Sequence, residues 1–275
     1  MRPILLLFVS SALLSAAPAL EVVRPIVAQS DGGAAMPPGF QHVGGETLFF
    51  SCRISGFAKT PEEKIHVAYS VQAFDAKGAA LTEIYKNEIV SEVSPQDKEW
   101  QPKIATEVQI PPLVAPGTYS IVVQAEDLIS NTKAETKVPF EVRGKMVELS
   151  DTLVVRNFHF YRGEDDAVAL EKAAYKPGDA VWAKFDITGY KFAEHNHIDV
   201  SYVASLLAPS GKVLWTQPDP AVDQDESFYA KRYVAAAMGI NLLASTKPGE
   251  FTLVISVKDN VGKQTVETKQ TFTVE

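Results

Sequence analysis

The chain has 275 residues, of which 46% are hydrophobic, and a formal net charge of −8 at pH 7. This length and apolar content allow either two ordinary domains with buried cores or one large domain. The acidic balance repels anions, so it argues against nucleic acid and anionic lipid as partners.

The first nineteen residues have the three parts of a secretory signal peptide. Arg2 supplies a positive charge, residues 4–14 are apolar, and Ala17-Pro18-Ala19 fits the small-residue cleavage pattern. The apolar stretch has about half the length that spans a bilayer, so we expect cleavage after Ala19 and no retained membrane helix. The mature protein is therefore expected in the periplasm or outside the cell, without membrane insertion.

An internal repeat begins where the signal peptide is expected to end. "GETLFFSCRISGF" from Gly45 lies over "GDAVWAKFDITGY" from Gly178 without a gap, and later "PGTYSIVVQAED" lies over "PGEFTLVISVKD". A repeat of this length indicates two copies of one domain. We predict domains at 20–143 and 150–275, joined near "VRGKMVELS" (142–150).

Inside each copy the apolar residues alternate with polar ones. Leu48, Phe50, Cys52 and Ile54 share one face of a strand, as an antiparallel sheet with one wet face requires. The predicted class is all-β, with two antiparallel β-sandwiches of about seven strands each. In the first copy these strands are expected near 20–27, 46–54, 65–74, 81–90, 105–110, 118–126 and 134–142. Pro139 predicts an edge strand or a bulge, and the Ala-rich residues 234–244 are predicted to be extended.

The stretches beginning at Pro116 and Pro248 resemble the late strands of bacterial Ig-like and fibronectin-III-like domains. "YKPGDAVWAKFDITGY" resembles the macroglobulin-type Ig-like modules of bacterial surface proteins. The resemblance implies two tandem Ig-like sandwiches but no single function, because many unrelated functions use such domains. Disulfide-bearing members pair a cysteine on the second strand with one on the sixth. Here Cys52 lies on the second strand, and the sixth, 118–126, has none.

Cys52 is the only cysteine of the chain, which excludes an internal disulfide and favours a bacterial exported protein over a small eukaryotic one. The second copy has Phe185 at its position, on the inward face. A buried thiol behaves as a small hydrophobe with a raised pKa, so we interpret Cys52 as core packing. The alternative is a reactive or intermolecular thiol.

The segment "EHNHID" (194–199) is the candidate metal site. In extended backbone His195, His197 and Asp199 point the same way, and this residue set can ligate zinc. The first copy has Glu62, Lys64 and His66 there instead. The alternative is that these are solvated loop residues, and no metal or other cofactor is predicted.

Two aromatic residues, Phe49 and Trp182, occupy equivalent positions on the face opposite the core. They are either covered by neighbouring structure or form an exposed patch for a partner or a sugar ring.

Sequence motifs of nucleotide-binding, zinc-protease and serine-hydrolase sites are absent from the chain. We therefore predict a non-enzymatic binding or structural protein of the bacterial envelope, with protein partners ranked above carbohydrate and the oligomeric state left open. The alternative is a metal-dependent or sugar-active protein with a site at the domain junction or in the His195/His197 loop.

Overall fold

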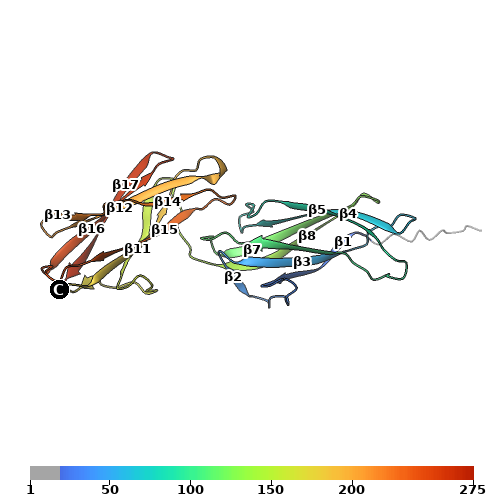
Figure 1. The fold of residues 1–275 in the computed structure, drawn as a ribbon, viewed down its shortest axis with the longest axis horizontal. Coiled ribbons are helices and arrows are strands. Elements are labelled where there is room, and N and C mark those ends of the chain that lie inside the picture. Colours follow the sequence, from blue (N-terminus) through green and yellow to red (C-terminus); the bar gives the residue numbers. More distant parts are fainter. Residues whose placement is uncertain (1–18) are drawn as a thin grey trace, which may run out of the picture.

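The structure is a computed structural model that describes residues 19–275, and this part of the chain is all-β (Figure 1). The predicted signal peptide lies, except for Ala19, outside the described residues. The only helix in the described range is one 3-10 turn at Glu194–Asn196. No described helix has the length and apolar character needed to cross a membrane.

The strands of residues 21–143 form one unit, called here the N-terminal unit. One sheet has the order β1-β3-β6 and the other β2-β8-β7-β4-β5. All pairs are antiparallel except β2 with β8, which is parallel. The strands are β1 (Glu21–Ala28), β2 (Gln41–Val43), β3 (Thr47–Ser55), β4 (Lys64–Phe74), β5 (Tyr85–Glu92), β6 (Lys103–Gln109), β7 (Gly117–Asp127) and β8 (Thr132–Arg143).

The strands of residues 154–274 form the C-terminal unit. Its sheets have the orders β15-β11-β9 and β10-β17-β16-β12-β13, with β14 also paired to β12. Figure 1 shows the two units end to end along the long axis. The strands are β9 (Val154–Tyr161), β10 (Ala174–Tyr175), β11 (Ala180–Thr188), β12 (Ile198–Leu207), β13 (Val213–Thr216), β14 (Ala221–Asp225), β15 (Tyr233–Asn241), β16 (Gly249–Asp259) and β17 (Gln264–Val274).

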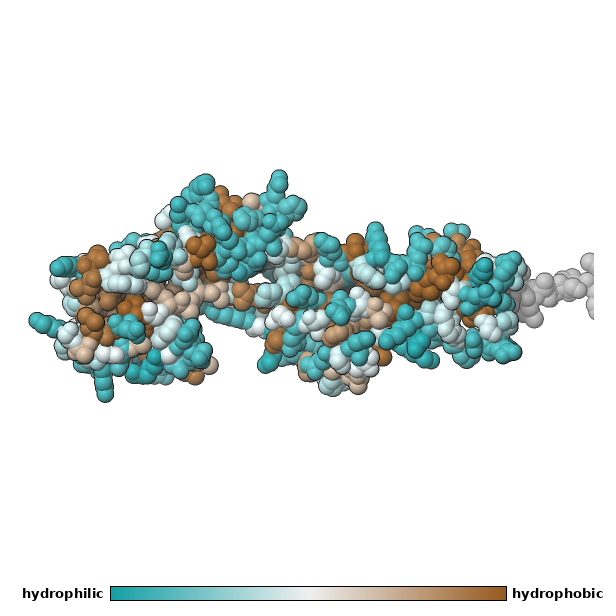
Figure 2. All heavy atoms as spheres, in the orientation of Figure 1, coloured by the Kyte–Doolittle hydropathy of each residue, from teal (hydrophilic) through white to brown (hydrophobic). Residues whose placement is uncertain are grey.

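Each unit buries its own core between its two sheets. On β3, the alternating residues Leu48, Phe50, Cys52 and Ile54 are all buried, and on β11 the corresponding residues from Val181 to Ile187 are buried as well. Removing these apolar surfaces from water is the main stabilising term of such a sandwich. The all-β prediction is confirmed. The visible face is mostly hydrophilic, with separate hydrophobic groups on both units (Figure 2).

All seven strands expected in the first copy are present, and β2 is an additional short one. The Ala-rich segment is extended, as β15. Pro139 pairs with Ser120 of β7, while β2 reaches only Glu141 to Arg143 of β8. At Pro139, β8 therefore pairs with β7 on one side and with no described strand on the other. Such an edge position tolerates proline, which has no backbone N–H to donate.

Several residue pairs separated by 133 positions share an uncommon backbone conformation. Arg24 and Asn157 have φ of 51° and 50°, and each lies at the bulge in its strand's pairing, with β3 or with β11. Gly56 and Gly189 have φ of 74° and 81°, and a Cβ on either would collide with a backbone carbonyl, that of Ala19 or that of Thr152. Only glycine fits both requirements.

The β7–β8 turn and the β16–β17 turn each contain a fully buried aspartate, Asp127 and Asp259, whose carboxylate accepts hydrogen bonds from the turn and from a neighbouring loop. Asp127 accepts hydrogen bonds from Ala58 N at 2.7 Å, Ile129 N at 2.9 Å and Ser130 Oγ at 2.7 Å. Asp259 accepts from Lys191 N at 3.0 Å and from the backbone N–H groups of Val261 and Gly262 in its own turn. Burial raises the pKa of Asp127, but the hydrogen bonds from Ala58, Ser130 and Ile129 outweigh it, so its pKa lies below the ordinary value.

Candidate functional site

A hollow of about 990 Å³ lies on the outer face of the sheet formed by β8, β7, β4 and β5. On β4, Val67 and Val71 point into the core. Successive side chains of a strand point to opposite faces, so Ala68 and Ser70 point outward and form the floor of the hollow. We call this hollow the sheet groove. Its walls carry Lys86 and Glu88 from β5, Gln124 and Glu126 from β7, and Lys133 and Glu135 from β8.

The side chains of the sheet groove bond to one another across neighbouring strands. Lys133 Nζ lies 3.2 Å from Glu126 Oε2, and Gln124 Nε2 donates to Glu135 Oε2 at 2.9 Å. At β5, the imidazole of His66 lies 2.7 Å from Glu88 Oε2. Exposed pairs of this kind add little stability, so these groups are available to exchange partners with a ligand.

The groove suits an extended polar ligand. Its small-residue floor lets a ligand backbone approach the sheet, and its walls offer charges of both signs as well as amide donors and acceptors. The groove walls carry no aromatic ring of the type on which a sugar stacks. Tyr69 lines the groove only from the inward-facing row of β4, where it packs against the core.

The structure does not place His195, His197 and Asp199 along one extended strand. His195 has φ 56° and ψ 31° inside the 3-10 turn, so the period-two spacing breaks there. Asp199 instead accepts a hydrogen bond from Asn260 Nδ2 at 2.9 Å, and this bond lowers its pKa. Within residues 19–275 no three His, Cys, Asp or Glu side chains are grouped so that they hold a metal ion.

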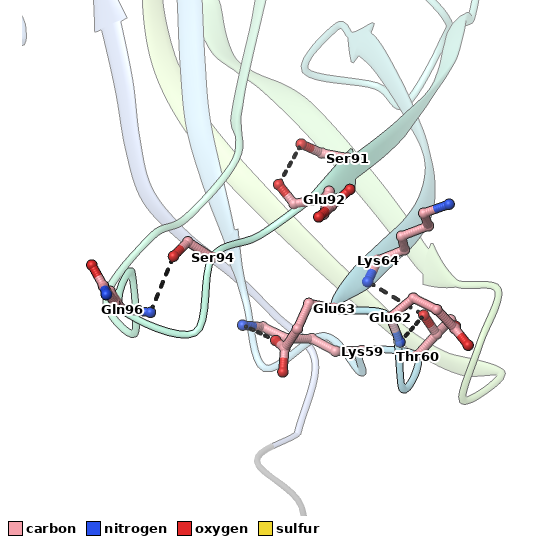
Figure 3. Close-up of polar contacts among 9 residues, drawn as sticks. All are labelled: Lys59, Thr60, Glu62, Glu63, Lys64, Ser91, Glu92, Ser94 and Gln96. Carbon is pink, nitrogen blue, oxygen red and sulfur yellow. Dashed lines mark hydrogen bonds and ion pairs between the residues drawn. The ribbon is translucent and has the colours of Figure 1, made fainter.

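The loop at the same place in the N-terminal unit closes on itself through polar contacts (Figure 3). Thr60 Oγ1 accepts from the backbone N–H groups of Glu62 and Lys64, both at 3.3 Å, and Lys59 Nζ bonds Glu63 Oε2 at 3.1 Å. These contacts tie the loop to the start of β4 and leave it as a solvated turn.

Phe49 and Trp182 are both half-buried. Trp182 pairs with Gly239 on β15 and with Tyr161 on β9. Its ring lies over Gly239, where a Cβ would stand 2.9 Å from ring atoms. The neighbouring Lys184 Nζ is 4.7 Å from the centre of the Tyr161 ring, a cation–π contact. Neighbouring strands thus cover part of Trp182.

Cys52 is 1% exposed and free, and burial raises its pKa to about 12. The interpretation as core packing is confirmed by its place among Phe50, Ile54 and Ile104 in the core of the N-terminal unit.

The junction of the two units has contacts that no sequence pattern indicates. Tyr229, in the loop before β15, packs against the core of the N-terminal unit, and Lys145 Nζ from the connecting segment lies 2.6 Å from the buried Asp186. Near the connecting segment, a hollow of about 420 Å³ is lined by residues including Leu149, Tyr190 and Arg232. Burial raises the pKa of Tyr190 well above the ordinary value.

Comparison with known proteins identifies no family. No family model matches the chain, and neither does any curated protein. Among solved structures, the C-terminal domain of the Streptococcus pyogenes antigen I/II-family protein AspA is 12% identical, with a TM-score of 0.32, over 92% of this chain and 99% of that one. A family 123 glycoside hydrolase from Clostridium perfringens is 14% identical, with a TM-score of 0.31, over 45% of this chain and 27% of that one. Bacteroides uniformis beta-glucuronidase 2 is 9% identical, with a TM-score of 0.33, over 83% of this chain and 26% of that one. Scores this low assign no function to the chain.

Proposed function

We propose that the protein is a non-enzymatic binding protein of the bacterial envelope whose sheet groove holds an extended polar segment of a protein partner. The observation that carries this proposal is the row of mutually paired charged and amide side chains along an open groove with a floor of Ala68 and Ser70. A partner segment replaces these internal pairs with pairs of its own.

The orientation of the wall groups supports binding rather than catalysis. Glu126 and Glu135 are each held by a neighbour on the adjacent strand, Lys133 or Gln124. A catalytic site instead needs acid and base groups aimed at one reacting atom.

The predicted signal peptide at residues 1–19 supports export, so we place the protein in the periplasm or outside the cell. The shared backbone conformations of Gly56 with Gly189 and of Arg24 with Asn157 support an origin by duplication, with each unit an Ig-like domain.

A sugar-active protein is the second candidate, because the hollow near the connecting segment combines the aromatic Tyr190 and Phe192 with the cationic Arg232. In this alternative the half-buried ring of Phe192, which packs edge-on against the buried Tyr190, stacks on a sugar, and the guanidinium of Arg232 binds a hydroxyl or carboxylate.

The test is affinity capture from the native envelope with the mature protein as bait. Ala68→Arg fills the groove floor, while Ser201→Arg adds the same side chain to the outward row of β12, the corresponding strand of the other unit. We expect Ala68→Arg to reduce recovery of the partner about tenfold or more, the equivalent of about 1.4 kcal/mol, and Ser201→Arg to leave it unchanged. Equal recovery by both variants contradicts the groove proposal. Turnover of glycosides that is lost in Arg232→Ala supports the second candidate instead.

A further inference from the structure

The strand β15 is an edge strand without charge. It pairs with β11 along its whole length from Tyr233 to Asn241 and ends the sheet β15-β11-β9. Its sequence, YVAAAMGIN, has neither a charged residue nor a proline. An edge of this kind exposes a row of backbone groups that another strand can pair with.

The backbone of β15 presents five residues to the open side. Leu242 N donates to Asp179 O, so the even-numbered residues of β15 face β11. In an antiparallel ladder the direction alternates, and the odd-numbered residues from Tyr233 to Asn241 point their N–H and C=O groups away from β11. In the described part of the chain, one hydrogen bond reaches these outward backbone groups: Tyr202 OH donates to Ala237 O at 3.3 Å. A carbonyl oxygen accepts two hydrogen bonds, so this contact leaves the edge open.

Other edges of the molecule are protected by charge. Among the described edge strands of five residues or more, the ones other than β15 all carry charged side chains: β1, β5, β6, β9 and β14. The contrast with β6 is direct, because β6 pairs with β3 as β15 pairs with β11. Where β6 has Lys103 and Glu107, β15 has Ala235 and Gly239. Charged residues on edge strands prevent pairing with other chains, and β15 lacks this protection.

We propose that β15 pairs antiparallel with β15 of a second copy of this chain, about a two-fold axis at Ala237. This register places Ala237 on Ala237 and Ala235 on Gly239, so the smallest exposed side chains of the strand meet on the outer face. It brings together no charged side chains at the seam, which matters for a chain with a net charge of −8. The five outward-facing residues of each copy each exchange two hydrogen bonds with the partner, and the three-stranded sheet becomes a continuous six-stranded one.

The first test is a disulfide at the two-fold axis. In this register the two Ala237 Cα atoms lie about 5.5 Å apart, a separation that a disulfide spans. Cys52 is buried, so Ala237→Cys adds the one reactive thiol among the described residues. We expect Ala237→Cys to form a covalent dimer under mild oxidation at micromolar concentration. The matched control is Ala105→Cys, at the corresponding position of β6, which is expected to stay monomeric. Equal cross-linking of the two variants overturns the proposal.

The second test uses the unmodified edge. Sedimentation velocity of the mature wild-type protein over a hundredfold range of concentration is expected to show a monomer–dimer equilibrium. Ala235→Lys introduces the residue that β6 has at this position and is expected to weaken dimerisation at least tenfold, while Lys103→Ala in β6 leaves it unchanged. Circular dichroism of each variant reports its folding. A wild-type monomer at all concentrations, or a dimer that tolerates Ala235→Lys, overturns the proposal.

Discussion

The hydroxyl of Tyr229 in the C-terminal unit donates to Oδ2 of Asp75 in the N-terminal unit at 2.9 Å. Tyr229 also packs against the core of the N-terminal unit. The hydrogen bond and this packing therefore link the two units in addition to the connecting segment of the chain. Burial, followed by the hydrogen bond and the charge of Asp75, raises the pKa of Tyr229 above its ordinary value of 10.0. The bond is therefore fully present below pH 10 and is lost only as the pH rises past the higher pKa of the folded state.

Removing this hydroxyl is expected to loosen the two units. Tyr229→Phe keeps the apolar packing and deletes one hydrogen bond to a carboxylate, worth about 1.5 to 3 kcal/mol. Spin labels on Lys137→Cys and Lys269→Cys, both exposed and one in each unit, report the distance between units. We expect a broader distance distribution in Tyr229→Phe. Tyr85→Phe is the matched control, because the Tyr85 hydroxyl accepts a hydrogen bond from Asn87 within its own unit. Identical distributions in the two variants contradict a restraining role.

Asp127 is expected to be a major contributor to the stability of the N-terminal unit. Asp127→Asn replaces one acceptor oxygen with an NH₂ group that faces buried donors, so we expect a loss of about 2 to 4 kcal/mol in the free energy of unfolding. Urea denaturation measures this loss. Asp165→Asn, at an exposed position, is the control.

The same carboxylate predicts a pH dependence. Because the folded-state pKa of Asp127 lies below its ordinary value of 3.8, its contribution is present above pH 3.8 and is lost as the pH falls through the folded-state pKa. Wild-type stability is therefore expected to fall more steeply with acid than that of Asp127→Asn. If the free energy of unfolding falls equally steeply with acid in the two proteins, Asp127 is not the source of the pH dependence.

The strands could be predicted from sequence because burial repeats every second residue, as it does from Leu48 to Ile54. The short strand β2 escaped prediction, because three residues do not establish a period. In the C-terminal unit the edge beside β12 is split between the short strands β13 and β14, and β14 carries Asp223 and Asp225. An exposed edge strand tolerates charge, so its composition resembles that of a loop.

The candidate sites depend on contacts between residues distant in sequence, and this limited their prediction. The sheet groove combines four strands, and its floor residues, Ala68 and Ser70, have no distinctive chemistry of their own. Tyr229 and Asp75 are 154 residues apart and belong to no motif. By contrast, His195 stands in a suggestive local pattern, but a left-handed backbone conformation breaks the extended geometry that the pattern assumed.

Gly189 and Gly211 separate two reasons why a backbone position requires glycine. Both have φ of 81°, but a Cβ on Gly189 collides with the carbonyl of Thr152, while one on Gly211 meets open space. Gly211→Ala is expected to cost about 1 to 2 kcal/mol from the left-handed conformation alone. In Gly189→Ala the added Cβ also has to displace the backbone at Thr152, so we expect a loss of about 3 kcal/mol or more in the free energy of unfolding. Thermal denaturation of both variants measures the difference, and equal costs contradict the collision.

Cys52 is expected to resist thiol reagents until the N-terminal unit unfolds. The thiolate is the reactive form, and a pKa of about 12 leaves very little of it at pH 8, while 1% exposure prevents access of the reagent. The labelling rate should therefore follow the population of unfolded protein as urea is added. The matched control is Lys137→Cys, which adds an exposed thiol and should label one site at once in native protein. Rapid labelling of native wild-type protein contradicts the core-packing role. If that role is correct, Cys52→Ser places a hydroxyl among Phe50, Ile54 and Ile104 and costs about 1 to 3 kcal/mol, because no polar partner lies on that face of β3.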